Sequence, residues 1–101
     1  MTAEELMSVV QKRLIADGLG FYRTSDPLLI DIASFREQNV SVRVGPGPLE
    51  KYEQPFVSVH YRSPHASETY DLRNCEDIPS LLVSVLNVLL LKHGLFIKEA
   101  F

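Results

Sequence analysis

The stretch IPSLLVSVLNVLLL, residues 78–91, carries most of what this sequence implies about its fold. It contains no charged residue, and 10 of its 14 positions are Leu, Val or Ile. The polar residues that follow Pro79 are Ser80, Ser84 and Asn87, whose spacing places them on one narrow side of a helix. A helix that is apolar around the rest of its circumference is usually buried on more than one side or spans a membrane.

The length of this stretch argues against a membrane span. At ~1.5 Å per residue, a helix over residues 78–91 is about 21 Å long, short of the ~30 Å core of a bilayer. A chain of 101 residues can bury one broad face of such a helix, but hardly all of it. The remaining apolar surface predicts a partner subunit. The side with Ser and Asn is either exposed to solvent or a place where another helix can approach closely.

The composition indicates one domain, residues 1–101, with 46% hydrophobic and 23% charged residues. The net charge is -3 and the 10 basic residues are scattered, which argues against a dedicated nucleic-acid binder. Cys75 is the single cysteine, so we expect no internal disulfide and a small, partly buried side chain. No signal peptide is evident, and we expect synthesis in the cytoplasm.

A second helix is predicted over residues 3–17. Thr2 and Glu5 form a capping box, because the Thr2 hydroxyl can accept a hydrogen bond from the Glu5 N–H while the Glu5 carboxylate reaches back. Gly18 supplies the left-handed residue that commonly ends a helix. The apolar residues recur at helical spacing, and the main row is Leu6, Val10 and Leu14.

Alternating apolar and polar residues indicate four β-strands in the middle of the chain. The clearest run is residues 40–44, where Val alternates with Ser and Arg. Similar runs lie at residues 28–33 and 57–62, and a weaker one lies at residues 70–73. Short polar connections favour hairpins, and hence an antiparallel meander with one solvent-facing side.

These elements predict a two-layer α+β sandwich, in which a four-stranded antiparallel sheet is flanked by an N-terminal and a C-terminal helix. Asp77 is a suitable N-cap for the second helix, and Gly94 is placed to end it. We therefore expect one helix over residues 78–92. The residues expected to be almost completely buried are Leu82, Val85, Leu86 and Leu89.

The connection over residues 45–55 is longer than a hairpin needs, and its prolines make it stiff. It is either a contact loop or a permissive spacer, and it lacks the backbone donors of a phosphate cradle. The apolar C-terminal tail is either a closing strand or an arm that reaches a neighbour. The candidate interaction residues are Gly45, Pro46, Gly47, Pro48, Leu49, Tyr52, Leu95, Phe96 and Phe101.

No set of residues can be nominated for catalysis or metal binding. His60, His65 and His93 lack a ligand spacing such as His-x-x-x-His, and His60 is expected on the solvent-facing side of the sheet. Cys75 precedes two acidic residues, a setting that opposes its use as a nucleophile. Because no nucleophile, base and orienting group occur together, we expect a non-enzymatic protein with no metal, cofactor or small-molecule substrate.

Aromatic residues gather around the third and fourth predicted strands. Arg62 and Arg73 lie beside them, so this cluster could stack nucleic-acid bases. Cross-strand packing explains the same residues, and the acidic balance favours that interpretation. The residues concerned are Tyr52, Phe56, Tyr61 and Tyr70.

Two segments together resemble the phage neck proteins known as tail terminators or tail-completion proteins. One is the amphipathic helix over residues 4–16; the other is YEQPFVSVHYRS, residues 52–63, followed by an apolar C-terminal helix. The resemblance implies two helices on an antiparallel sheet, assembled as a sixfold ring that caps the tail tube of a virion. It implies no catalytic residues. The partners would be copies of the chain and other assembly proteins, with nucleic acid only passing through the lumen.

Two classes of function thus compete. The first is a structural assembly protein, most concretely a ring subunit of the tail-terminator type. The alternative is a small intracellular protein-binding module, such as an immunity protein, an inhibitor or a secretion chaperone, which would use the open sheet face or an apolar groove.

Overall fold

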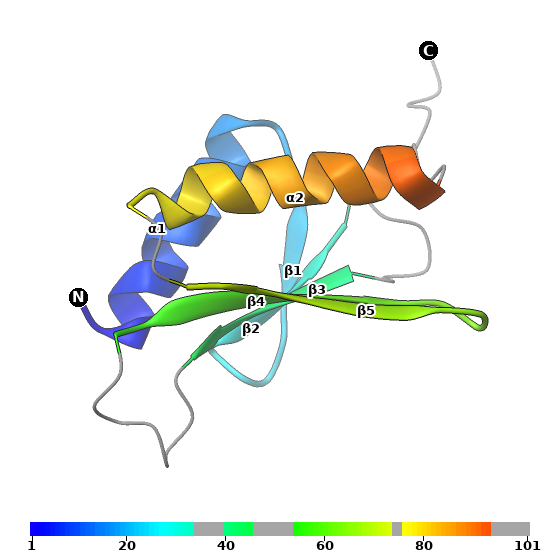
Figure 1. The fold of residues 1–101 in the computed structure, drawn as a ribbon. Helices are drawn as coiled ribbons and strands as arrows, with labels where there is room; N and C mark the ends of the chain where they lie inside the picture. Colours follow the sequence, from blue (N-terminus) through cyan, green and yellow to red (C-terminus); the bar gives the residue numbers. More distant parts are fainter. Residues whose placement is uncertain (34–39, 46–53, 74–75, 94–101) are drawn as a thin grey trace.

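A computed structural model describes residues 1–33, 40–45, 54–73 and 76–93 of the chain (Figure 1). Along the chain, one helix precedes five strands and a second helix follows them. The elements are α1 (Ala3–Ala16), β1 (Phe21–Arg23), β2 (Leu29–Ile32), β3 (Val40–Gly45), β4 (Phe56–Arg62), β5 (Ser67–Leu72) and α2 (Ile78–His93).

The fold is α+β, as predicted, but the prediction of four strands was wrong. The additional strand is β1, which pairs antiparallel with β2 through Phe21 opposite Ile32 and Arg23 opposite Ile30. A further backbone bond runs from the Ala33 N–H to the Gly20 carbonyl, at 2.9 Å. Three residues are too few to show an alternating pattern, so periodicity alone could not reveal this strand.

The sheet is an antiparallel meander with the strand order β1-β2-β3-β4-β5. Val42 faces Val59 across β3 and β4, and Val59 in turn faces Tyr70 on β5. The predicted hairpin between β4 and β5 is confirmed, since the Ser63 N–H donates to the Ala66 carbonyl at 2.8 Å. The register places every second residue of each strand on the same face.

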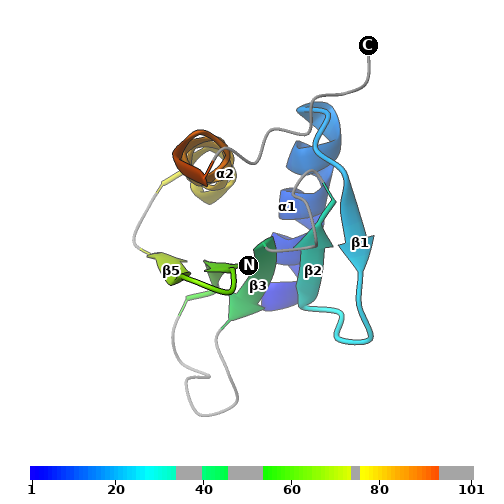
Figure 2. The same ribbon diagram turned by 90° about the vertical axis from the view of Figure 1, so that its right-hand side faces the viewer.

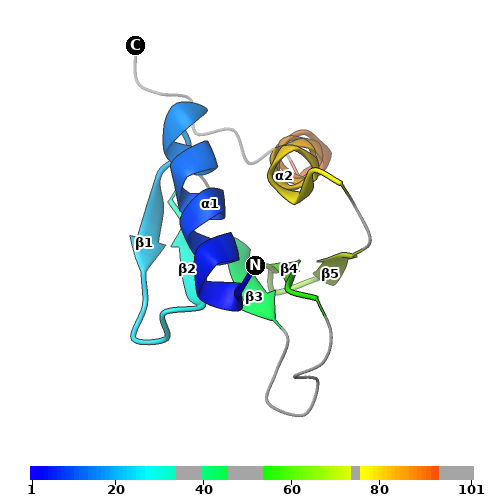
Figure 3. The same ribbon diagram turned by 90° about the vertical axis from the view of Figure 1, so that its left-hand side faces the viewer.

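Both helices cover the same face of the sheet and leave the other face open (Figures 2 and 3). In these two views α2 is seen end-on while α1 lies lengthwise, so the helices cross. α1 contacts β3, whereas α2 contacts β4 and β5. The core between the layers is built from aliphatic side chains of both helices and four strands, and its fully buried members include Val10, Leu14, Ile30, Ile32, Val40, Val42, Val57, Val59, Leu82, Leu86 and Leu89.

The predicted starts of both helices and the predicted end of α1 are found in the structure, whereas Gly94, which was expected to end α2, lies outside the described residues. Thr2 Oγ1 accepts from the Glu5 N–H at 3.1 Å, which caps α1. Gly18 has a φ of 73°, the left-handed conformation that glycine adopts without steric penalty. At the start of α2, Asp77 Oδ1 accepts from the Ser80 N–H at 3.1 Å.

The burial predicted for α2 is confirmed for Leu82, Leu86 and Leu89, which are at most 1% exposed. It was wrong for Val85, which is only partly buried. The three leucines recur at spacings of four and three along the line that faces the sheet, whereas Val85 lies on the flank of that line.

Candidate functional site

The side of α2 that points away from the sheet exposes three large apolar residues. Leu81, Val88 and Leu91 are 37%, 55% and 68% exposed, and exposed Ser84 lies between the first two. Their spacings of three, four and three place the four side chains on one side of the helix. We refer to Leu81, Ser84, Val88 and Leu91 as the α2 outer face.

The N-terminal end of α2 is attached to α1 through Ser80. Its hydroxyl donates to Asp77 Oδ2 at 2.7 Å and accepts from Arg13 Nη1 at 2.9 Å. Arg13 Nε in turn donates to Asp17 Oδ2 at 2.9 Å. The hydrogen bonds from the Ser80 hydroxyl and N–H lower the pKa of Asp77. Of the polar residues of this helix, Ser80 thus mediates a helix–helix contact, whereas Ser84 and Asn87 are exposed.

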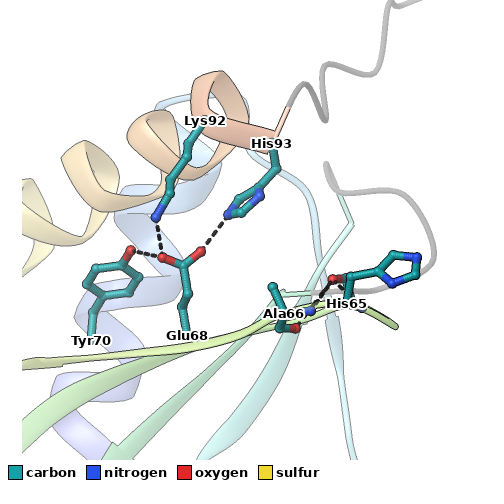
Figure 4. Close-up of polar contacts among 7 residues, drawn as sticks. His65, Ala66, Glu68, Tyr70, Lys92 and His93 are labelled. Atoms are coloured by element: carbon teal, nitrogen blue, oxygen red, sulfur yellow. Dashed lines mark hydrogen bonds and ion pairs between the residues drawn. The ribbon is translucent and has the colours of Figure 1, made fainter.

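The C-terminal end of α2 is attached to β5 through Glu68 (Figure 4). Its Oε1 accepts from Tyr70 Oη at 2.8 Å and from Lys92 Nζ at 2.5 Å, and its Oε2 lies 2.5 Å from His93 Nε2. Glu68 and Tyr70 come from the side of β5 that faces α2. We refer to Glu68, Tyr70, Lys92 and His93 as the Glu68 cluster.

The hydrogen bonds of the Glu68 cluster shift the ionisation of its members. Those from Lys92, Tyr70 and His93 lower the pKa of Glu68 from 4.5 to about 2, because each favours the carboxylate over the carboxylic acid. The same carboxylate raises the pKa of Tyr70 and of Lys92 by hydrogen bonding. The cluster therefore holds a carboxylate anion at neutral pH and fixes the end of the helix.

Sequence reasoning did not find the Glu68 cluster. His93 was correctly predicted at a helix end, but its partner lies 25 residues earlier, on a strand. A signal was present, since Glu68 and Tyr70 precede buried Leu72 at intervals of two residues and so share with it the face on which the helix packs. The other two histidines are where they were expected, with His60 on the open face of β4 and His65 in the β4–β5 turn.

A groove of about 630 Å³ lies where the two helices begin. Its rim carries the carboxylates of Glu76 and Asp77. Two of its apolar lining residues are accessible, with Met1 68% and Val9 36% exposed. The apolar lining comprises Met1, Leu6, Val9, Pro55, Ile78 and Pro79. We refer to this feature as the interhelical groove.

The open face of the sheet is polar and has a shallow hollow of about 350 Å³. Its cross-strand rows follow from the register, with Ser41 opposite His60 and His60 opposite Thr69. Arg43 lies beside this hollow and donates from Nη1 to Asp26 Oδ2 at 2.8 Å. A hydrogen bond from the Leu28 N–H and the one from Arg43 lower the pKa of Asp26.

The aromatic residues divide between the two faces of the sheet. Tyr61 and Tyr70 face the helices, whereas Phe56 lies on the open face opposite Gly45 and packs under Arg73, whose Cζ is 3.7 Å from the ring centroid. These three rings therefore do not form one platform for stacking bases, and cross-strand packing accounts for them.

Of the predicted interaction residues, the structure describes only Gly45, the last residue of β3. It is half-buried beneath Phe56. Cys75 lies outside the described residues. So do the other predicted interaction residues, which are Pro46, Gly47, Pro48, Leu49, Tyr52, Leu95, Phe96 and Phe101.

Within residues 1–33, 40–45, 54–73 and 76–93 there is no group of three or more His, Cys, Asp or Glu side chains that could hold a metal ion. Neither described helix combines the length and the apolar character that crossing a membrane requires. Comparison of the chain with protein-family models, curated proteins and solved structures found no match.

Proposed function

We propose that this chain is a non-enzymatic assembly protein, which functions by binding other protein subunits through the α2 outer face. The observation that carries the proposal is the exposure of Leu81, Val88 and Leu91 along one side of a helix. A contiguous exposed apolar patch commonly marks a protein-binding site, whereas single exposed apolar residues are normal on any surface. The hydrogen bonds at both ends of α2 hold this face in place, so binding requires little ordering.

The magnitude of the apolar contribution indicates what the outer face can do alone. Fully burying an exposed large aliphatic side chain contributes ~1.5–3 kcal/mol. Because Leu81, Val88 and Leu91 are 37%, 55% and 68% exposed, burying what remains accessible of all three contributes roughly 2–5 kcal/mol. Association itself costs an estimated ~4–15 kcal/mol in lost translational and rotational freedom. The two ranges overlap, so the α2 outer face supports weak binding by itself and stable assembly when a second surface contributes.

In its narrower form, the proposed protein is a ring subunit of the phage tail-terminator type. The support is the resemblance of the sequence to that family, together with the arrangement of two helices on one face of an antiparallel sheet. Copies of the chain would then be its first partners.

A second candidate function is a protein-binding module of the immunity-protein, inhibitor or chaperone class. The observation that favours it is the open sheet face, whose hollow carries Arg43, Arg62 and His60 beside hydroxyl groups. Such a module would remain a monomer until its partner is present.

Sedimentation velocity and native mass spectrometry distinguish the two candidates. We expect the wild-type chain to form oligomers at micromolar concentration and Leu91→Asp to weaken them at least tenfold. Ile15→Asp is the matched control, because Ile15 is 67% exposed and Leu91 68% exposed, each on a helix. A wild-type chain that stays monomeric at tens of micromolar would overturn the assembly proposal in favour of the second candidate.

A further inference from the structure

We infer that the α2 outer face of one copy of the chain docks into the interhelical groove of a second copy, so that subunits associate head to tail. This inference rests on the proposed function, and it specifies both surfaces of the contact. It starts from the fact that the described part of the chain leaves two apolar surfaces of different shape exposed.

The two surfaces complement each other in shape. The α2 outer face is a convex ridge of Leu81, Val88 and Leu91 on a helix. The interhelical groove is concave, and its volume of about 630 Å³ exceeds that of a single side chain several times. An apolar cavity of ~150 Å³ already holds a benzene molecule, so the groove has room for several aliphatic side chains of the ridge.

The charges at the two surfaces are also complementary. Glu76 and Asp77 lie at the groove, whereas Lys92 follows Leu91 at the end of the ridge. Lys92 donates to Glu68, but its side chain is 53% exposed and an ammonium group has three donors, so a second carboxylate can bind it as well. Docking Leu91 in the groove places Lys92 of that copy near the two carboxylates. It also brings the C-terminal end of one α2 to the N-terminal end of the next, where the helix dipoles attract.

The two surfaces lie at different places on the molecule, so one copy can use both of them at once. The groove lies at the N-terminal end of α2, and the most exposed ridge residues, Val88 and Leu91, lie toward its C-terminal end. Each copy can therefore offer its ridge to one neighbour and its groove to another. Such heterologous contacts generate a ring when the rotation closes and a filament when it does not. A reciprocal two-fold dimer, in which each ridge enters the groove of the other copy, would stop at two subunits, so the head-to-tail contact predicts wild-type oligomers larger than a dimer.

A mixing experiment with two variants tests this geometry. Leu91→Asp disables the ridge and Val9→Asp disables the groove, while Ile15→Asp is again the control on α1. We expect each of the first two variants to be monomeric alone and the control to assemble as the wild type does. Mixed in equal amounts, the two variants should form a 1:1 dimer and nothing larger, because only one intact ridge and one intact groove can meet.

Circular dichroism verifies that each variant is folded. Val9→Ser is a second groove variant that adds no charge, and we expect it to weaken association about tenfold. Wild-type oligomers that both groove variants leave intact would overturn the head-to-tail contact but not the assembly proposal. So would folded ridge and groove variants that stay monomeric when mixed. A monomeric wild-type chain would overturn the assembly proposal itself.

The charged rim gives an independent measurement. Glu76→Lys should weaken wild-type assembly several-fold at low ionic strength, and by less at high salt, since screening reduces the attraction to Lys92. An unchanged dissociation constant at low salt would contradict the assignment of Glu76 to the interface.

Discussion

The imidazole ring of His93 stacks on the phenol ring of Tyr61, with the ring centroids 4.0 Å apart and the planes inclined by 12°. Tyr61 is a core residue of β4 that is only 5% exposed, so this stack joins the last residue of α2 to the buried side of β4. Together with the bond from His93 to Glu68, it fixes the direction in which the α2 outer face points.

The pH dependence of stability should reveal the Glu68 carboxylate. Because its pKa is about 2 in the folded chain and 4.5 as a free side chain, the unfolded state binds the proton more readily. The stabilisation is thus complete above pH 4.5 and is lost as the pH falls toward 2. Urea melts of the wild type and of Glu68→Gln should differ most at pH 7 and converge in that window. A difference that is independent of pH would contradict this account.

Removing one donor should move this titration. Tyr70→Phe deletes the second-largest cause of the lowered Glu68 pKa, so the carboxyl resonance of Glu68 should titrate at higher pH in NMR. Tyr22→Phe makes the same chemical change at an exposed tyrosine of β1 and should leave the Glu68 titration where it is. Equal shifts in both variants would indicate an indirect effect.

Truncation on the two sides of α2 should have very different effects. Leu86→Ala removes a fully buried side chain and should lower the free energy of unfolding by about 2–5 kcal/mol. Leu91→Ala, at a position that is 68% exposed, should change the stability of the monomer by less than ~0.5 kcal/mol. Chemical denaturation at concentrations below assembly measures both, and a Leu86→Ala value within the range of Leu91→Ala would contradict the described core.

A methyl group at Gly45 should displace the ring of Phe56. A Cβ atom there would lie 2.9 Å from the Phe56 Cζ, closer than such atoms approach, and the ring is held between Gly45 and Arg73. We expect Gly45→Ala to destabilise the chain by about 1–3 kcal/mol, as overpacking does. In a double-mutant cycle with Phe56→Leu the two effects should not be additive. Additive effects would show that the ring does not occupy this position.

The connection after β3 should be dispensable for folding and matter for assembly. Gly45 and Phe56 already face each other across β3 and β4, so a short turn can join the strands. Replacing residues 46–53 by Asn-Gly keeps Gln54 and Pro55 at the groove and leaves a four-residue connection, a common hairpin length. We expect an unchanged thermal midpoint but weaker oligomers. Oligomers as strong as those of the wild type would mean that the loop is only a spacer.

The helices and the central strands could be predicted because their signals are local. The Thr2 and Asp77 caps, the periodicity of α1 and α2, and the alternation in β3 and β4 depend on neighbours within a few residues. β1 was missed because a strand of three residues is defined by its partner, β2, rather than by a pattern of its own.

The surfaces of the candidate site were harder to predict because they depend on how distant segments meet. The sequence indicated that α2 has more apolar surface than one layer can cover, but not that Leu81, Val88 and Leu91 are the exposed residues. The Glu68 cluster joins a strand residue to residues 24 and 25 positions later on α2, and the interhelical groove combines residues from the starts of both helices. The spacing of Glu68, Tyr70 and Leu72 shows which face of β5 they share, but only tertiary packing shows that the end of α2 lies over that face.

The meander also has a consequence for the way in which the chain reaches this structure. Each strand pairs with the next one in sequence, so the sheet can grow by closing short loops, at a small entropic cost per step. We expect the largest entropic cost to arise when α1 and α2 meet through Arg13 and Ser80, which are 67 residues apart. The strands that pair are neighbours in sequence, and such contacts favour rapid folding. We therefore expect docking of α1 on α2 to be the slow step. Changes at Ser80 should then slow refolding more than changes in the β4–β5 turn.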